Sequence, residues 1–377
     1  MKTIINLTVF ILLMGLSTVC AQELALVREN DLFGYIDKSG AFAIEPQFEK
    51  ADSFSEGYAP VLQDDKWGYI NTSGEWAIQP EYDRVKAFNS GLALVLKDDK
   101  WDYINAKGEV LETPVTEKYY DFQDGVAFLR KESLVGLLGT DGKVILEPSY
   151  KEIKPFIDGH AKVKKGDLWG MIDKKGELVI PVEYQELGTY NKNGVWARKG
   201  DAFGVLIGNE LKVVDGADKI WDFSEGSTLT YARSDKQVGF INNQGEWVIE
   251  PTYKAARAFN KGLAPVRGKK KKWGYINEEG NVVVDFVYKD AEVFSDNGLA
   301  PVKEKDWGFI NTSGELVIPT EYAISVGFSF SFFDYLQQKG FVNGLARVKY
   351  KKQWGFLDKN GQPLGGKWFQ NAELFAE

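Results

Sequence analysis

One short step recurs ten times in this chain of 377 residues, an aromatic or aliphatic residue that is in most copies followed by Gly. The copies begin at residues 33, 67, 101, 135, 169, 203, 238, 273, 307 and 354. Successive copies are 34 or 35 residues apart, except across the last interval of 47 residues, which holds an insertion at about 325–340. A fixed period of this length is typical of a repeat architecture. We therefore predict one array of about ten units over residues 22–377, with the insertion in unit nine and no appended catalytic domain.

Within a unit the apolar residues alternate with period two, which indicates β-strands rather than helices. Residues 92–99, 66–71 and 75–80 exemplify three short strands of a meander. Asp or Asn stands four residues after the repeated step in eight of the ten units, and Gly follows three residues later in nine. An Asx side chain and a Gly with positive φ are suited to close a hairpin. We expect Pro to end the third strand and the following link to form an irregular or helical turn.

Six of the eleven tryptophans occupy the repeated step, where we expect them to stack between units as core. A Gly beside the ring would let a neighbouring ring or backbone approach closely. Asp102 replaces that Gly in one unit, while Val135 and Val238 lack the ring, so those junctions should be looser. The predicted structural positions are Trp67, Gly68, Trp101, Trp169, Gly170, Trp273, Gly274, Trp307, Gly308, Trp354 and Gly355.

The repeated pattern of aromatic-Gly-Tyr/Phe-Ile-Asn/Asp, with Gly at the turn and Tyr after the Pro, resembles the WG-repeat (KWG-type) family of bacterial β-rich repeats. The resemblance extends over residues 24–377. It implies an exported protein, and members of the family mostly lack an assigned biochemical activity.

The fold class expected from these observations is all-β. A unit of three strands is marginal alone and must gain its stability from its neighbours. We favour an open, curved, solenoid-like array, because ten units exceed the usual four to eight blades of a propeller and those blades have four strands. The alternative is a closed, propeller-like ring, in which the first strand at residues 24–27 completes the last sheet.

The first 21 residues are predicted to be a secretory signal peptide. Lys2 precedes an apolar stretch, and Val19 and Ala21 fit a cleavage site before Gln22. The alternative is a lipoprotein anchored at Cys20. We expect no transmembrane span in the mature chain and a periplasmic or extracellular location.

The sequence favours a protein without enzymatic activity, cofactor or metal. His160 is the only histidine, and we interpret it as a surface substitution within the repeat rather than a catalytic base. The recurrent acids, such as Asp64 and Asp65, are interpreted as turn formers. A net charge of −8 argues against nucleic-acid binding, and the basic run at 269–272 occupies a hairpin turn.

The function expected first is a scaffold for protein–protein interaction. A module that binds cell-envelope glycans is second, and a glycoside hydrolase is third. The candidate docking residues lie in the insertion, where aromatic residues crowd together, and Trp76 and Trp247 are added as candidates for exposed rings. The insertion candidates are Phe328, Phe330, Phe332, Phe333 and Tyr335.

Overall fold

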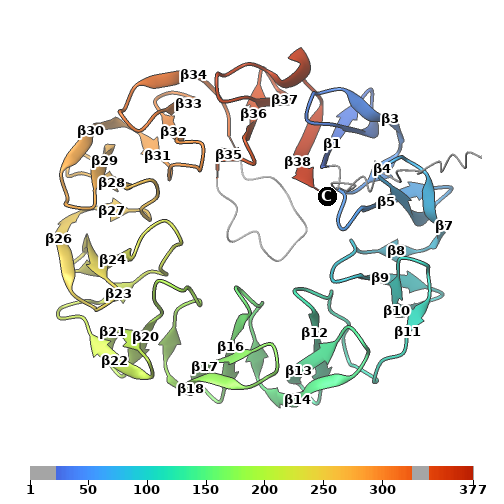
Figure 1. Cartoon of the computed structure of the whole chain (residues 1–377), viewed down its shortest axis with the longest axis horizontal. Coiled ribbons are helices and arrows are strands. Elements are labelled where there is room, and N and C mark those ends of the chain that lie inside the picture. Colours follow the sequence, from blue (N-terminus) through green and yellow to red (C-terminus); the bar gives the residue numbers. More distant parts are fainter. Residues whose placement is uncertain (1–22, 325–338, 377) are drawn as a thin grey trace, which may run out of the picture.

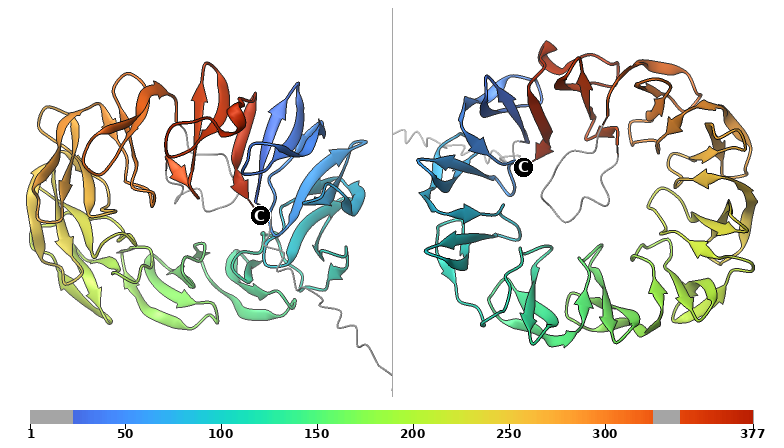
Figure 2. Two further views of the ribbon diagram at one scale, coloured as in Figure 1. Left: turned by 45° about the horizontal axis from the view of Figure 1, so that its top comes forward. Right: turned by 180° about the vertical axis from the view of Figure 1, so that it is seen from behind.

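The computed structural model describes residues 23–324 and 339–376, and these form a closed ring of ten small antiparallel sheets (Figure 1). The sheets follow one another around a central opening in both face views, so the fold is a ten-bladed β-propeller (Figure 2). The expected all-β repeat array is confirmed. The preferred open array is wrong and the alternative ring is right, because the last strand pairs with the first.

Each blade is numbered by its place in the chain, and its strands follow from the centre outward. Blade one contains β38 (Asn371–Ala376), β1 (Leu24–Glu29), β2 (Leu32–Ile36) and β3 (Phe42–Phe48), and blade two contains β4 (Lys50–Ala51), β5 (Tyr58–Gln63), β6 (Lys66–Asn71) and β7 (Trp76–Tyr82). Blade three contains β8 (Arg84–Val85), β9 (Leu92–Lys97), β10 (Lys100–Asn105) and β11 (Val110–Leu111), and blade four contains β12 (Val126–Lys131), β13 (Leu134–Gly139) and β14 (Val144–Tyr150). Blade five contains β15 (Glu152–Ile153), β16 (His160–Lys165), β17 (Leu168–Asp173) and β18 (Leu178–Tyr184). Blade six contains β19 (Glu186–Leu187), β20 (Trp196–Lys199), β21 (Ala202–Ile207) and β22 (Glu210–Val213), and blade seven contains β23 (Lys219–Ile220), β24 (Leu229–Ser234), β25 (Gln237–Asn242) and β26 (Trp247–Tyr253). Blade eight contains β27 (Ala255–Ala256), β28 (Leu263–Arg267), β29 (Trp273–Asn277) and β30 (Val282–Tyr288), and blade nine contains β31 (Asp290–Ala291), β32 (Ala300–Lys303), β33 (Trp307–Ile310) and β34 (Leu316–Tyr322). Blade ten contains β35 (Phe341–Val342), β36 (Leu345–Tyr350) and β37 (Gln353–Leu357), followed by the 3₁₀ turn η2 (Leu364–Gly366).

Eight of these sheets have four strands, so the expected three-stranded unit was incomplete. The additional strand in most blades is a two-residue segment such as Lys50–Ala51, in the link expected to be irregular or helical. A strand of two residues is too short to show period-two alternation, which explains why the sequence pattern did not reveal it.

The turn between the second and third strands of the repeat pattern forms as expected. Asn71 Oδ1 accepts hydrogen bonds from the backbone N–H groups of Ser73 and Glu75, each at 3.0 Å. Gly74 follows with φ of 81°, a left-handed conformation that favours Gly. The Asx–Gly prediction is therefore confirmed at this turn.

The third strand of the same sheet passes so close to the Gly of the repeated step that a side chain would not fit there. A Cβ at Gly68 would lie 2.6 Å from the carbonyl oxygen of Ile78 and 2.8 Å from the nitrogen of Pro80. The register shifts here, between the pairs Trp67–Tyr82 and Tyr69–Ile78, so the Gly faces a β-bulge that contains the Pro. The expectation that Pro ends the strand is wrong, because pairing resumes at Tyr82 beyond the bulge.

Asp102 stands at the position of this Gly in one unit, and there the third strand does not pass close to it. The strand that would cross it, β11, has only two residues and pairs with Tyr103 and Ile104 but not with Asp102. Absence of the Gly in this unit thus coincides with loss of the close crossing.

In seven of the ten units a second aromatic residue, two positions after the repeated step, packs on a Phe of the next unit. The Tyr35 ring packs on Phe54 of the next unit at 4.7 Å between centroids, and its hydroxyl donates to the Asp52 carbonyl at 2.8 Å. Tyr69 and Tyr275 make the same hydrogen bond to Lys86 and Glu292. Burial raises the pKa of the Tyr35 and Tyr275 phenols well above the ordinary value, so they stay neutral donors.

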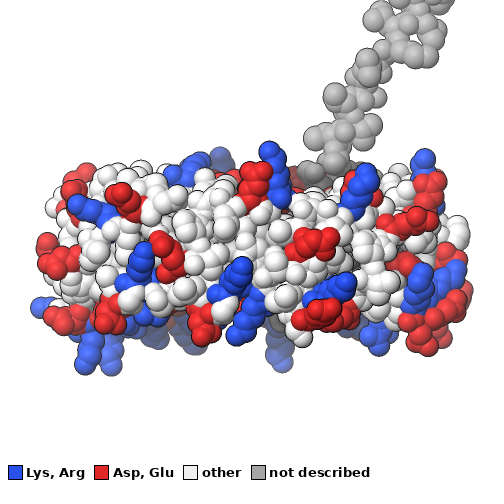
Figure 3. All heavy atoms as spheres, turned by 90° about the horizontal axis from the view of Figure 1, so that it is seen from below, with Lys and Arg blue, Asp and Glu red and all other residues white. Residues whose placement is uncertain are grey.

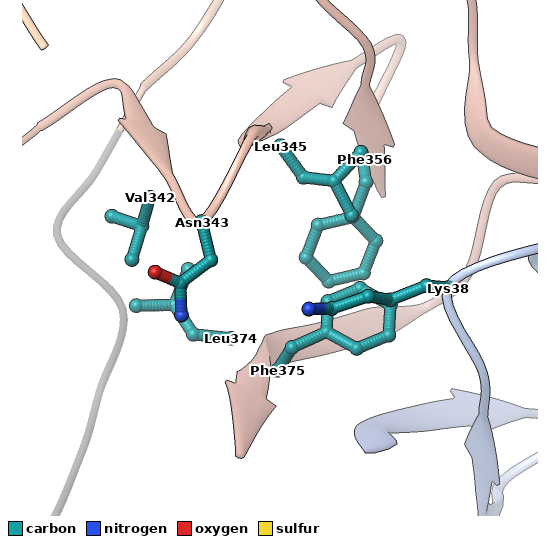
Figure 4. A pocket seen from close by; sticks show the side chains of 7 residues that line it. All are labelled: Lys38, Val342, Asn343, Leu345, Phe356, Leu374 and Phe375. Carbon is teal, nitrogen blue, oxygen red and sulfur yellow. The ribbon is translucent and has the colours of Figure 1, made fainter. Parts of the chain in front are cut away.

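The ring closes where β38 adds to the inner edge of the first sheet. Val27 pairs with Ala372, and Gln370 N–H donates to the Arg28 carbonyl at 2.9 Å. Phe375 of β38 packs on Phe356 at 5.0 Å. The space left between these rings and Lys38 is a cavity of about 10 Å³, room for about one water molecule (Figure 4). The seam is therefore closely packed.

Candidate functional site

The candidate site is the inner wall of the ring, formed by the first strand of each blade and the loop that follows it. A Phe anchors most of these loops, and seven of these Phe side chains are at most 5% exposed. Their residues are Phe54, Phe88, Phe122, Phe156, Phe223, Phe259 and Phe294. Because the ring of each Phe is held in the core, the residues on either side of it are left at the inner edge of the blade.

Hydrogen bonds join each of several loops to the loop of the next unit. Glu56 accepts from the backbone N–H groups of Ser90 and Gly91 at 2.6 and 2.8 Å. Ser90 Oγ then accepts from the N–H of Gly125 at 2.8 Å. Farther around the ring, Asn260 Nδ2 donates to the Phe294 carbonyl at 2.8 Å. These bonds fix the wall before any ligand binds.

Along part of this wall lies a cavity of about 1340 Å³. It is lined by the inner segments of six consecutive units, around residues 120–123, 151–162, 189–191, 222–226, 258–261 and 293–296. Val135, one of the two positions that lack the repeated ring, is part of the lining.

The aromatic centre of this cavity is the pair His160 and Tyr190, whose rings stack at 3.6 Å between centroids and 18° between planes. His160 Nδ1 lies 2.6 Å from the Asp158 carbonyl oxygen, a distance at which the ring N–H donates. Tyr190 occupies the position of the buried Phe in other units and is instead half-buried. This replacement of Phe by Tyr is visible in the sequence and marks the site, but it was not among the predicted site residues.

Charged groups of both signs line the same wall. Lys162 Nζ donates to the Leu187 carbonyl at 3.0 Å, and burial lowers the pKa of this amine. Asp222 accepts from Trp196 Nε1 at 2.6 Å and from the Thr189 N–H at 3.0 Å. The wall therefore offers both cationic and anionic hydrogen-bonding groups.

Asp121, in the same lining, has a different environment. Burial raises the pKa of its carboxyl, partly offset by the nearby charge of Lys86. Its Oδ1 is buried and has no hydrogen-bond partner among the described residues.

Two groups of candidate residues were predicted from the sequence. Phe328, Phe330, Phe332, Phe333 and Tyr335 are outside the described residues. Trp76 and Trp247 are half-buried on the outer strands β7 and β26, and Trp247 Nε1 donates to the Asp215 carbonyl at 3.0 Å. Neither ring lines the inner-wall cavity.

The tryptophans of the repeated step are half-buried or buried, and cations lie over four of the six rings. Lys154 and Lys164 lie over the Trp169 ring at 5.8 and 5.3 Å from its centroid, and Arg257 lies over Trp273 at 4.5 Å. Trp67, Trp101, Trp169 and Trp354 are half-buried, and Trp273 and Trp307 are each 8% exposed. The rings thus cover the edges of the blade cores, while the buried Tyr or Phe two residues later joins the blades.

The outer wall presents a different surface. Acidic and basic side chains are interspersed over it, with several basic groups projecting at its lower edge (Figure 3). Over residues 23–324 and 339–376 there is no cluster of three or more side chains suited to hold a metal ion. In the same ranges no helix has the length and apolar character needed to span a membrane.

Comparison with known proteins gives a family match and distant structural likenesses. The profile of the WG containing repeat matches residues 33–67, 67–101, 136–169, 169–201, 239–273, 273–306 and 307–323, more than half of the chain. A search of curated protein sequences found no match.

Among solved structures, the chain is similar to a eukaryotic initiation factor at 12% identity and a TM-score of 0.47, covering 94% of this chain and 98% of that one. BamB from Moraxella catarrhalis is similar at 10% identity and a TM-score of 0.33, with 70% and 90% covered. The WD40 β-propeller domain of Doa1 is similar at 11% identity and a TM-score of 0.27, with 74% and 92% covered.

Proposed function

The chain belongs to the WG-containing repeat family, and from this premise we propose that it is an exported, non-enzymatic scaffold whose inner wall binds an extended segment of a partner protein. The observation that carries the proposal is the cavity of about 1340 Å³ lined by six successive units. Pockets for small molecules usually measure about 300–1,000 Å³, so a longer ligand fits this surface better.

The chemistry of the wall supports a peptide as that ligand. Half-buried aromatic rings such as Tyr190 offer apolar contacts, while Lys162 and Asp222 bring opposite charges to the same cavity. A peptide carries apolar side chains, charges of both signs and a backbone that both donates and accepts hydrogen bonds.

The contacts of the titratable groups favour binding over catalysis. Lys162 is engaged with a backbone carbonyl, Asp222 with two N–H donors, and His160 with a carbonyl and the Tyr190 ring. A nucleophile paired with a base that a third group orients would be needed for covalent catalysis. The described contacts instead position these groups as parts of a rigid surface.

Export rests on the amino-terminal sequence. Lys2, the apolar stretch and the small residues before Gln22 support secretion to the periplasm or beyond, with anchoring at Cys20 as the alternative. A partner would then be another protein of the cell envelope or outside the cell.

The test is selection of peptides from a random 12-residue display library on the purified chain, followed by calorimetry. We expect selected peptides to bind with micromolar affinity and to lose about tenfold or more on Tyr190→Ala, because a central aromatic contact is removed. Val179→Ala, at a position 38% exposed on the outer strand β18, is the matched control and should leave binding unchanged. Peptides that bind Tyr190→Ala as tightly as the natural chain would overturn the inner-wall proposal.

A further inference from the structure

A second cavity lies between blades seven and eight, at a place where three repeat positions depart from their usual residues. Its volume is about 470 Å³. We call it the aromatic slot and define it by its lining: Trp221, Tyr231, Arg233, Lys236, Val238, Lys254, Ala255, Ala256, Arg257 and Trp273.

Two of the three departures make room. Val238 stands where six units have Trp, and it removes a ring from the slot. Ala255 is the first residue of the inner strand β27, whereas the inner strands β4, β8, β15, β19, β23 and β31 each begin with a charged residue. Both small residues contribute to the same cavity, so the extra space is concentrated at one junction.

The third departure adds an aromatic surface. Trp221 takes the position that Lys154 and Arg257 hold in their units, where those cations lie over the Trp of the repeated step. In this unit a Trp therefore stands at the cation position, and Val238 stands at the usual Trp position. Trp221 is half-buried and stacks on Tyr231 at 4.8 Å between centroids and 23° between planes.

The charge of the slot is one-sided. Its lining contains four basic side chains and no acidic one. Arg233 pairs with Asp218 and Arg257 with Asp290 and Glu292, but Lys236 and Lys254 are exposed and make no ion pair among the described residues. Arg267, opposite Ala255 in the ladder, has a buried Nε without a hydrogen-bond partner in the described part of the chain.

We propose that the aromatic slot binds a carboxylate-bearing ring, of the kind found in the uronic-acid units of acidic polysaccharides. The apolar face of a sugar ring packs on aromatic surface by dispersion, and the half-buried stacked pair Trp221 and Tyr231 provides that surface. The carboxylate takes the charge-assisted hydrogen bonds that Lys236 and Lys254 are free to donate. This site is separate from the inner-wall cavity and independent of the peptide proposal.

The same chemistry is shared by free aromatic acids, so the test has two probes. The full chain is titrated by calorimetry with trigalacturonate and, separately, with 4-hydroxyphenylacetate; maltotriose is the uncharged control. Saturable binding of trigalacturonate without maltotriose binding supports the acidic sugar as the ligand. Binding of 4-hydroxyphenylacetate alone would overturn the sugar assignment.

Three variants locate the binding. Lys236→Gln combined with Lys254→Gln removes two exposed cations and should weaken trigalacturonate about tenfold or more. Lys289→Gln, at the same repeat position as Lys254 in the next unit, lies outside the lining and should change nothing. Val238→Trp restores the common residue, fills the slot and should abolish binding.

The double lysine variant keeps the proposal testable if Val238→Trp fails to fold. Absence of saturable binding by either charged probe at millimolar concentration would overturn the proposal. Equal affinity in the natural chain and in the double lysine variant would do the same.

Discussion

Removal of the closing strand should open the ring and lower its stability by several kcal/mol. A chain that ends after Gln370 loses all of β38, which pairs with β1 at four positions and covers Leu24, a side chain with 0% exposure. Each net backbone hydrogen bond contributes about 0.5–1.5 kcal/mol. Full burial of a Phe contributes about 1.5–3 kcal/mol, and the half-buried Phe375 contributes part of that amount.

Together these terms predict a loss on the order of 4–6 kcal/mol in the free energy of unfolding. Arg347 adds to the effect, because it is 5% exposed, donates to the Ala372 carbonyl and pairs with Glu373 at 3.5 Å. Deletion would leave this buried cation without those partners, a costly arrangement.

Urea unfolding followed by tryptophan fluorescence measures the loss, and small-angle X-ray scattering measures the opening as an increased radius of gyration. Leu178→Ala, on an outer strand and 55% exposed, is the control and should cost less than about 1 kcal/mol. A truncated chain with the stability and the radius of the full chain would refute closure through β38.

Three further predictions concern the junctions and the amino terminus. Tyr275→Phe removes the hydroxyl that donates to the Glu292 carbonyl at 2.7 Å, and should cost about 1–2 kcal/mol in urea unfolding; no cost would show that this bond does not join the blades. Gly136→Ala places a Cβ 2.2 Å from the Leu146 carbonyl oxygen and should cost about 3 kcal/mol, against about 1–2 kcal/mol for Gly125→Ala, where φ is 86° and the space is open. Mass spectrometry of the exported chain should give an amino terminus at Gln22, whereas a lipid-modified Cys20 would establish the anchored alternative.

Stability should also fall at alkaline pH. Burial raises the pKa of Tyr82, Tyr184 and Tyr322 to about 12, while tyrosines of the unfolded chain titrate near their usual value of about 10. Because the folded pKa is the higher one, these groups contribute their full stability below pH 10 and lose it progressively between pH 10 and 12. Urea midpoints measured across this range test the prediction, with the triple Tyr→Phe variant as the control. An equally steep fall in that variant would assign the loss to other groups.

The sequence predicted what is local to a unit. The Asn71–Gly74 turn, the alternating strands and the need for a small residue at Gly68 all depend on residues close in the chain, where short-range chemistry decides the outcome. Closure depends instead on the small rotation between neighbouring blades, accumulated over ten units, and on the pairing of Val27 with Ala372. No single repeat contains that information.

The two cavities likewise combine residues that stand out within one repeat with contacts that depend on how neighbouring blades pack. Val238 was recognised as a departure from the repeat, but its meeting with Ala255 and Trp221 in one slot depends on how blades seven and eight pack. Tyr190 and His160 are thirty residues apart in sequence, and only the packing of successive inner loops stacks their rings. Whether a substitution in one repeat forms part of a site can therefore be inferred only when its neighbours in the adjacent blades are known.

The most direct test of the inner-wall proposal is hydrogen–deuterium exchange of the purified chain with and without a peptide from the display selection. The account predicts slowed exchange of the backbone amides at residues 151–162, 189–191 and 222–226, the inner segments that line the cavity. Protection confined to the outer strands β18, β22 and β26, with these inner loops unchanged, would contradict it.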